Sequence, residues 1–173
     1  MALVHIPIRI ASLQTATNPG NIYWKKVNFT NWETQWPSFK PNVESSIYGL
    51  AGIPTNINLS GATKRIDCGF HTTGSTGTTA KLQISSAIVG WDINAPTPLN
   101  VTLTAETLQS YSLGVGYNNS FIVMTQNLTP NIYAPEDDPP FLLVVKLFRD
   151  GDDAGDTLEA DLDLVGWWLV CEV

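Results

Sequence analysis

The sequence predicts an all-β protein: an antiparallel two-sheet sandwich of jelly-roll type with an irregular N-terminal arm. Short segments in which apolar and polar residues alternate recur along the chain, and turn-forming residues separate them. No stretch of twelve residues keeps the 3.6-residue apolar period of a helix. Because no fixed-period repeat is visible, propellers and solenoids are not expected.

Eight segments carry the strand pattern: residues 4–10, 22–29, 64–70, 79–91, 99–105, 120–125, 141–148 and 157–173. Pro7 marks the first as an edge strand or an arm. In the last, residues 158–164 alternate so that the leucines share one face. Gly166 indicates a bulge that shifts this phase, and only one of Trp167 and Trp168 can then face the core.

The longest stretch expected to be irregular covers residues 30–62, which are too aromatic to be disordered. We therefore divide the chain into an aromatic-rich N-terminal arm, residues 1–40, and a sandwich domain, residues 41–173. At 173 residues the chain is long enough to bury a core without help from a disulfide or a metal.

The charge is sparse, acidic and unevenly distributed. The net charge is −7, which disfavours nucleic-acid binding. Residues 1–86 carry a net charge of +4 and residues 87–173 carry −11. One interpretation is that oppositely charged edges of neighbouring subunits meet and set their register. The other is that the turns near the C-terminus are simply acidic. No apolar run is long enough for a membrane span, and no secretory signal is visible.

Two further features concern residues that could be cross-linked or bind a metal. Cys68 and Cys171 lie in apolar strand segments, where buried free thiols are expected and one disulfide is the alternative. The acidic segment 150–156 is expected to be a solvated hairpin turn, with a hard-cation loop as the alternative. Arg149 could pair with Asp153 or Asp156 and hold this turn. No cofactor and no metal are predicted.

Catalytic signals are poor. The two histidines, His5 and His71, fall in the arm and in a Gly/Thr-rich segment and are expected on the surface. No Gly-x-Ser-x-Gly elbow and no phosphate-binding Gly-rich loop occur. We therefore expect a binding or structural protein and not an enzyme.

The candidate binding residues are aromatic: Trp24, Trp32, Trp36, Phe39 and Trp91. The early ones have three interpretations. They could cover the open end of the core, anchor a protein partner, or form a platform on which sugar rings stack. Exposure of Trp32, Trp36 and Trp91 in an open groove would favour the sugar platform.

Residues 64–170 combine a Thr/Gly-rich tip, a long strand ending in Trp91, Thr-alternating strands, and a strand ending in Arg149-Asp150. An Asp156-Thr157 pair then precedes an alternating strand with a Leu-Val-Gly step. This pattern resembles small jelly-roll proteins encoded among the virion genes of tailed phages.

The resemblance implies a virion structural protein, located on the capsid surface or the tail after synthesis in the host cytoplasm. The subunit would form a homotrimer and decorate or cement the capsid by binding the major capsid protein or another virion protein. Residues 1–40 would grip the capsid by strand addition and aromatic anchors. The alternative is a receptor- or carbohydrate-binding head of a tail fibre or spike.

Overall fold

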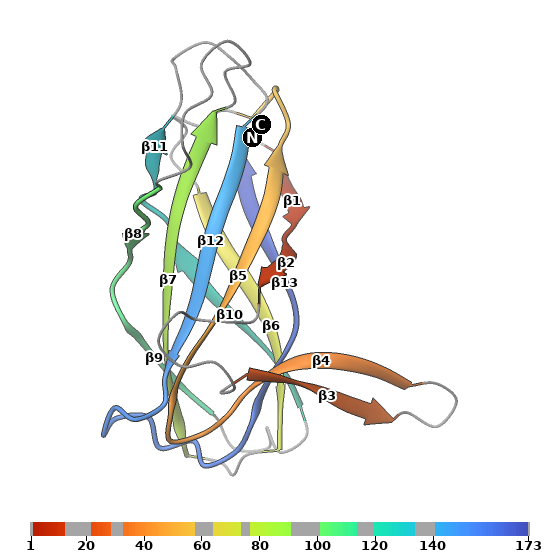
Figure 1. Cartoon of the computed structure of the whole chain (residues 1–173), viewed down its shortest axis with the longest axis vertical. Coiled ribbons are helices and arrows are strands. Elements are labelled where there is room, and N and C mark those ends of the chain that lie inside the picture. Colours follow the sequence, from red (N-terminus) through yellow and green to blue (C-terminus); the bar gives the residue numbers. More distant parts are fainter. Residues whose placement is uncertain are drawn as a thin grey trace.

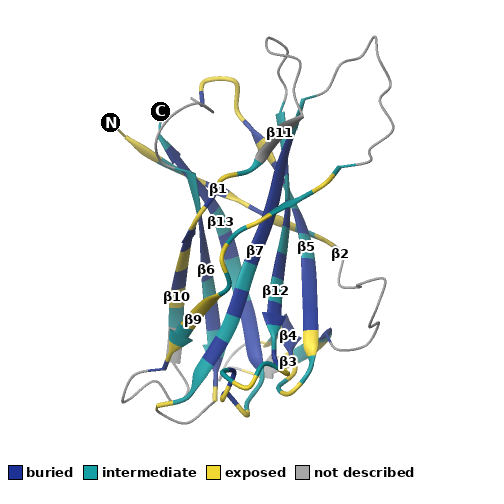
Figure 2. Ribbon diagram, turned by 90° about the vertical axis from the view of Figure 1, so that its left-hand side faces the viewer, coloured by how far each residue is buried: buried dark blue, intermediate teal, exposed yellow. Residues whose placement is uncertain are grey.

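The computed structural model describes residues 2–12, 22–28, 33–57, 64–73, 77–90, 101–113, 120–133 and 141–172. These residues form thirteen strands and no helix, and hence no helix that could cross a membrane. The strands build two sheets that pack face to face (Figure 1, Figure 2). The expected antiparallel two-sheet sandwich of jelly-roll type is confirmed.

Sheet I runs in the order β10-β6-β13-β4-β3, with β1 also paired to β13. Its strands are β1 (Leu3–Pro7), β3 (Ile22–Asn28), β4 (Glu33–Phe39), β6 (Lys64–Thr72), β10 (Ser120–Asn127) and β13 (Leu162–Glu172). All of its pairings are antiparallel.

Sheet II runs in the order β11-β7-β12-β5-β2, with the short strands β8 and β9 also paired to β7. Its strands are β2 (Arg9–Ser12), β5 (Glu44–Ile53), β7 (Thr79–Gly90), β8 (Thr104–Ala105), β9 (Gln109–Ser112), β11 (Asn131–Tyr133) and β12 (Phe141–Asp150). Its pairings are antiparallel except that β11 runs parallel to β7.

The core lies between the sheets, as alternation requires. In β12 every second residue is buried, and Leu143, Val145 and Leu147 are at most 1% exposed. Phe39 and Phe70 of sheet I are fully buried and pack with ring centroids 6.4 Å apart. Each such side chain contributes about 1.5–3 kcal/mol by leaving water.

The N-terminal residues belong to both sheets and are not an irregular arm where the structure describes them. β1 pairs with β13 in sheet I, and β2 pairs with β5 in sheet II. Between them, the Ile8 amide donates to the Trp167 carbonyl at 3.0 Å, and the Ile8 side chain is buried. One strand was expected over residues 4–10, but the chain crosses here from one layer to the other.

The expectation of an irregular segment over residues 30–62 is wrong, because β4 and β5 lie within it. The inward residues of β5 include Gly49 and Ala51, whose small side chains weaken the sequence signal for a buried strand. Only glycine fits at position 49, because a Cβ atom there would lie 2.2 Å from the Trp167 ring. The turn between the strands places Asn42 at a φ of 60°, a conformation that asparagine tolerates.

Two other strand boundaries differ from the prediction. Of residues 99–105 only Thr104–Ala105 is a strand in the described part, and β9 was not expected. Residues 157–161 form a loop before β13, although Leu158 is 1% exposed and packs in the core. Alternation marked Leu158 correctly as buried. Its amide donates to the Thr79 carbonyl at the start of β7, and its carbonyl accepts from the Arg149 side chain.

The predicted bulge at Gly166 is confirmed, because the β13–β6 register shifts between Leu164 and Gly166. After the shift Trp167 is 3% exposed, whereas Trp168 lies on the outer face and is half-buried. Only one ring of the adjacent pair faces the core, as expected.

The β3–β4 hairpin projects sideways from one end of the body (Figure 1). Only the last residues of β4 pair with β13, through Leu162 with Phe39 and Asp163 with Ser38. The fold thus leaves a two-stranded ribbon that is attached only at its base.

Candidate functional site

A row of polar side chains crosses the outer face of sheet I where the hairpin joins the body. Tyr23 pairs with Ser38, Ser38 with Asp163, and Asp163 with His71, so the row spans β3, β4, β13 and β6. Residues paired in an antiparallel sheet point to the same face, which brings these four side chains together.

Asp163 is the centre of this cluster and is completely buried. Its carboxylate accepts hydrogen bonds from Ser38 Oγ at 2.6 Å and pairs with His71 Nδ1 at 3.0 Å. Lys25 Nζ lies 3.1 Å from it. A buried carboxylate needs such partners, because an unpaired buried charge is costly.

Asp161 is the second carboxylate of the cluster and is partly exposed. It accepts a hydrogen bond from Tyr23 Oη at 2.6 Å and lies 3.5 Å from Lys25 Nζ. Burial and then this hydrogen bond raise the pKa of Tyr23. Burial alone would lower the pKa of Lys25, but the hydrogen bond and charge of Asp163, with Asp161 in support, raise it above its ordinary value.

This cluster fastens the hairpin and is not a nucleophile–base pair. The Ser38 hydroxyl donates its hydrogen to the Asp163 carboxylate, so it is not a serine whose proton a histidine takes. Tyr23, Lys25 and Ser38 come from the hairpin, and their polar contacts end on two carboxylates of the body. The hairpin is therefore held in one position at its base.

The other face of the hairpin borders a hollow that we call the tryptophan cleft. It has a volume of about 340 Å³, and its lining includes Arg9, Ile10, Trp24, Gln35, Trp36 and Trp167. Trp24 is 49% exposed, and Arg9 and Gln35 are also exposed. The cleft thus has an apolar floor and a mouth with one indole ring and two hydrogen-bonding side chains.

The sequence-predicted aromatic residues separate in the structure. Trp24 is exposed on the hairpin, Trp36 is 9% exposed, and Phe39 is fully buried in the core. The Trp36 ring lies 5.6 Å from the His71 ring, over the fastening cluster. Trp24 and Trp36 both border the tryptophan cleft, whereas Trp32 and Trp91 lie outside the described residues.

Arg149 and Asp156 form a second charged pair, at the turn that leads into β13. Both side chains are buried, and two guanidinium nitrogens donate to the carboxylate at 2.9 and 3.0 Å. Arg149 also donates to the carbonyl oxygens of Phe39, Leu158 and Ala160. Of the two partners expected for Arg149, Asp153 and Asp156, the structure has Asp156, and the pair holds a loop that bonds to β7 through Asp156, Thr157 and Leu158.

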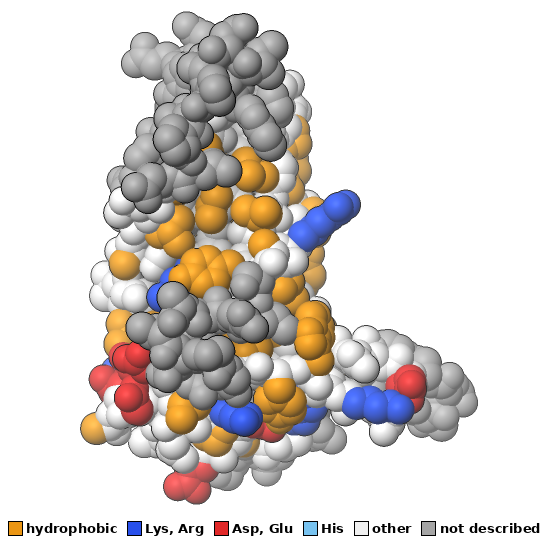
Figure 3. All heavy atoms as spheres, in the orientation of Figure 1, with side chains coloured by type: hydrophobic (Ala, Val, Ile, Leu, Met, Phe, Trp, Pro, Cys, Tyr) orange, Lys and Arg blue, Asp and Glu red, His pale blue; other side chains and the backbone are white. Residues whose placement is uncertain are grey.

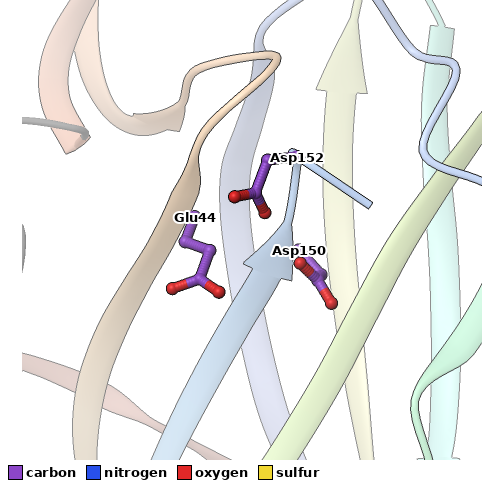
Figure 4. Close-up of side chains that lie close together, drawn as sticks. All are labelled: Glu44, Asp150 and Asp152. Carbon is purple, nitrogen blue, oxygen red and sulfur yellow. The ribbon is translucent and has the colours of Figure 1, made fainter. Parts of the chain in front are cut away.

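Three carboxylates gather at the same end of sheet II. Figure 4 shows Glu44, Asp150 and Asp152. One carboxylate oxygen from each of them lies within 4.8 Å of the other two. Burial, followed by hydrogen bonding with Asp152 and repulsion from the neighbouring acids, raises the pKa of Asp150 to about 6. Calcium takes about six to eight oxygen ligands, and one oxygen from each of these three side chains would supply at most half of them. We refer to the three carboxylates as the acidic patch.

The cysteines are free and buried, as expected, so no disulfide joins them. Burial raises the pKa of the Cys68 thiol, and the charge of Asp67 adds to this effect. Burial also raises the pKa of Cys171. Both thiols are therefore poor nucleophiles.

Sequence reasoning missed the fastening cluster. It placed His71 in a surface loop, but His71 belongs to β6 and pairs with a buried carboxylate. The available signal was the pair Asp161 and Asp163 on the polar side of an alternating strand, where carboxylates must be solvated or paired. The identity of the partners depends on strand order, which alternation does not encode.

Comparison with known proteins identifies no family. No family model matches the sequence, and no curated protein matches it. Among solved structures, the chain is similar to one described as TmCBM61 in complex with β-1,4-galactotriose, with a TM-score of 0.39 and 10% identity over 99% of this chain and 88% of that chain. A similarity this low says nothing about what the present chain binds.

Proposed function

We propose that this chain is a structural subunit of a phage particle that attaches to a neighbouring virion protein through the β3–β4 hairpin. The main observation in support is that the hairpin projects from the body while the Asp163 cluster fixes its base (Figure 1). A projecting element that is already ordered loses little conformational entropy on binding. The sequence pattern over residues 64–170 supports the virion assignment.

Trp24 is the residue that we assign as the anchor for the partner. It is one of three large apolar side chains of the described chain that are exposed, with Leu3 and Val123. Tryptophan is enriched among residues that dominate binding energy at interfaces. The role is passive: the sandwich supplies a rigid body, and the hairpin supplies the contact.

The test is attachment of purified protein to particles that lack it. Trp24→Ala should weaken attachment by about 30-fold or more, since truncation of an anchor costs about 2 kcal/mol or more. Leu3→Ala is the matched control and should attach normally, because Leu3 is exposed to a similar degree on another strand. Equal attachment of wild type and Trp24→Ala would contradict the hairpin assignment.

Truncation of the N-terminus would be a poorer test. Ile6 and Ile8 are buried and β1 and β2 belong to the sheets, so their removal would disturb the sandwich itself. Electron microscopy of purified particles supplies the location: density over the capsid supports the proposal, and absence from the particle contradicts it.

A second candidate function is carbohydrate binding at the tryptophan cleft, as a receptor-binding head would require. The specific observation is the exposed Trp24 ring at a cleft whose lining also includes the exposed residues Arg9 and Gln35. Aromatic faces stack on sugar rings, and neighbouring donors bond the hydroxyl groups. Binding to a glycan array that Trp24→Ala abolishes, with density at the tail tip, would favour this candidate over capsid attachment.

A further inference from the structure

The edge of sheet II at β2 has a hollow on each of its faces. Arg9 pairs with Leu50 on the outer face, and Ile10 pairs with Gly49 on the inner face. The outer hollow is about 430 Å³ and is bordered by Arg9, Ala11, Leu50, Gly52 and Leu142. The inner hollow is the tryptophan cleft, which Ile8 and Ile10 also border. Figure 3 shows apolar side chains along the outer face of this sheet.

Among the described residues, β2 has a sheet partner on one side only, the strand β5. An extended segment added along its free side would place successive side chains on alternate faces. These side chains would enter the outer hollow and the tryptophan cleft in turn. The edge thus offers a free strand side with a hollow next to it.

The chain carries such a strand at the opposite edge of the sandwich. β10 is the end strand of sheet I and contains no charged residue and no proline over Ser120–Asn127. Val123 is 68% exposed on its outer face, and Ile122 lies on its inner face and packs partly against the core. Natural proteins protect such edges with charges or proline, or cover them.

The two edges lie on opposite sides of the body. β10 lies across from β7 and β9, where Tyr111 Oη donates to the Thr125 carbonyl at 3.1 Å. β2 continues from Ile8, which contacts β13 across the other side. Figure 2 shows β10 and β2 on opposite sides of the sandwich.

We propose that β10 of one copy adds to β2 of the next, so that copies of this chain join head to tail. Val123 would enter the outer hollow beside Leu50, while Met124 and Gln126 on the inner face stay buried in the core of their own copy. One contact would cover both the exposed side chain of an end strand and the outer hollow beside an open edge. A head-to-tail contact closes into a ring if the rotation allows and otherwise continues as a filament.

This inference deepens the proposed function by naming a second copy as a partner, and its test needs no phage particle. The mass of the purified protein in solution should exceed that of one chain by sedimentation or light scattering. Val123→Asp and Ala11→Asp should each weaken association by about tenfold or more, because each buries an unpaired charge. Leu3→Asp and Ala105→Asp, at exposed positions of other short strands, are the matched controls and should associate normally.

Cross-linking tests the pairing itself. A chain carrying both Val123→Cys and Ala11→Cys should give covalent dimers, trimers and larger species on oxidation, whereas neither single variant should. The natural thiols Cys68 and Cys171 are buried and should not contribute. A monomeric wild-type protein, or cross-linked dimers from Ala11→Cys alone, would overturn the head-to-tail pairing. If cross-linking shows the β10–β2 pairing but the Trp24→Ala variant still attaches to particles normally, only the assignment of the hairpin as the attachment site is contradicted.

Discussion

Two places in this sandwich use charged side chains to reinforce backbone that has only a few hydrogen bonds to the sheets, and they do so differently. At the loop before β13, the Arg149–Asp156 pair is sealed from solvent and bonds three carbonyl groups besides. At the base of the hairpin, Asp163 is equally buried, but its cation Lys25 is 28% exposed. The first pair is part of the core, and the second joins the core to a projecting element.

The comparison shows that burial of both partners decides what a charge pair does. Removing one member of a sealed pair leaves an unpaired buried charge, which is strongly destabilising. Where one partner reaches solvent, water can replace part of the lost interaction. We therefore expect substitution of Arg149 to lower the stability of the whole fold, and substitution of Asp163 to lower mainly the stability of the hairpin.

The largest effect is expected for Arg149→Met. It leaves Asp156 buried without its cation and removes donors from three carbonyls, so the free energy of unfolding should fall by about 3–5 kcal/mol. Denaturant unfolding measures this. Arg65→Met is the control, because the Arg65–Asp67 pair is partly exposed, and it should cost about 1 kcal/mol or less. A loss at Arg149 no larger than at Arg65 would refute the distinction.

An intermediate effect is expected for Asp163→Asn. The amide keeps the shape but loses the charge that binds Lys25 and His71, which should cost about 1–3 kcal/mol. Hydrogen exchange should quicken in β3 and β4 while β12 keeps its protection. Asp161→Asn, at a partly exposed position, should speed hydrogen exchange in β3 and β4 less than Asp163→Asn does. Uniform loss of protection in both sheets would mean that the hairpin is not a separable unit.

The smallest effect is expected at the acidic patch and depends on pH. The pKa of Asp150 is raised from 3.8 to about 6, so between these values the folded state holds a proton that the unfolded state has released. The protonated carboxyl group of Asp150 therefore favours the folded state at low pH, and this contribution to the free energy of unfolding is lost as the pH rises from about 4 to about 6. Asp150→Asn should raise the free energy of unfolding at pH 7 by less than about 1 kcal/mol and leave it unchanged near pH 4.

The control for this prediction is Glu159→Gln, at an exposed acid of the neighbouring loop. It should leave the pH dependence of unfolding as in the wild type. If Asp150→Asn and the wild type show parallel stability curves from pH 4 to pH 7, the acids of this patch do not repel one another as their spacing indicates.

Much of the fold could be predicted because strand alternation is a local property. The buried positions of β6 and β13, the bulge at Gly166 and the single inward ring of the Trp167–Trp168 pair follow from a two-residue period and one glycine. β5 escaped prediction because Gly49 fills its inward position with space for Trp167, which comes from the other sheet. Gly49 and Ala51 therefore separate the two large inward side chains of β5, Ile47 and Ile53, and weaken its alternating pattern.

The candidate site was predicted less well, since it depends on which strands become neighbours. The aromatic residues of the early chain suggested a binding region, yet Phe39 lies in the core while Trp24 is exposed on the hairpin. His71 and Asp163 are 92 residues apart in the sequence and meet because β6 and β13 pair in one register. Pairing of Arg149 with either Asp153 or Asp156 was predicted because all three lie within one turn, and the structure has Asp156.

The sequence by itself determined an all-β chain with apolar-alternating strands and an acidic turn next to an arginine, since each of these depends on near neighbours along the chain. Only the tertiary structure decided that the N-terminal strand crosses between sheets, that a hairpin projects from a cluster centred on Asp163, and that β2 and β10 form opposite edges. These features depend on strand order and register, which arise when distant segments compete for the same core, and local pattern carries no record of that competition.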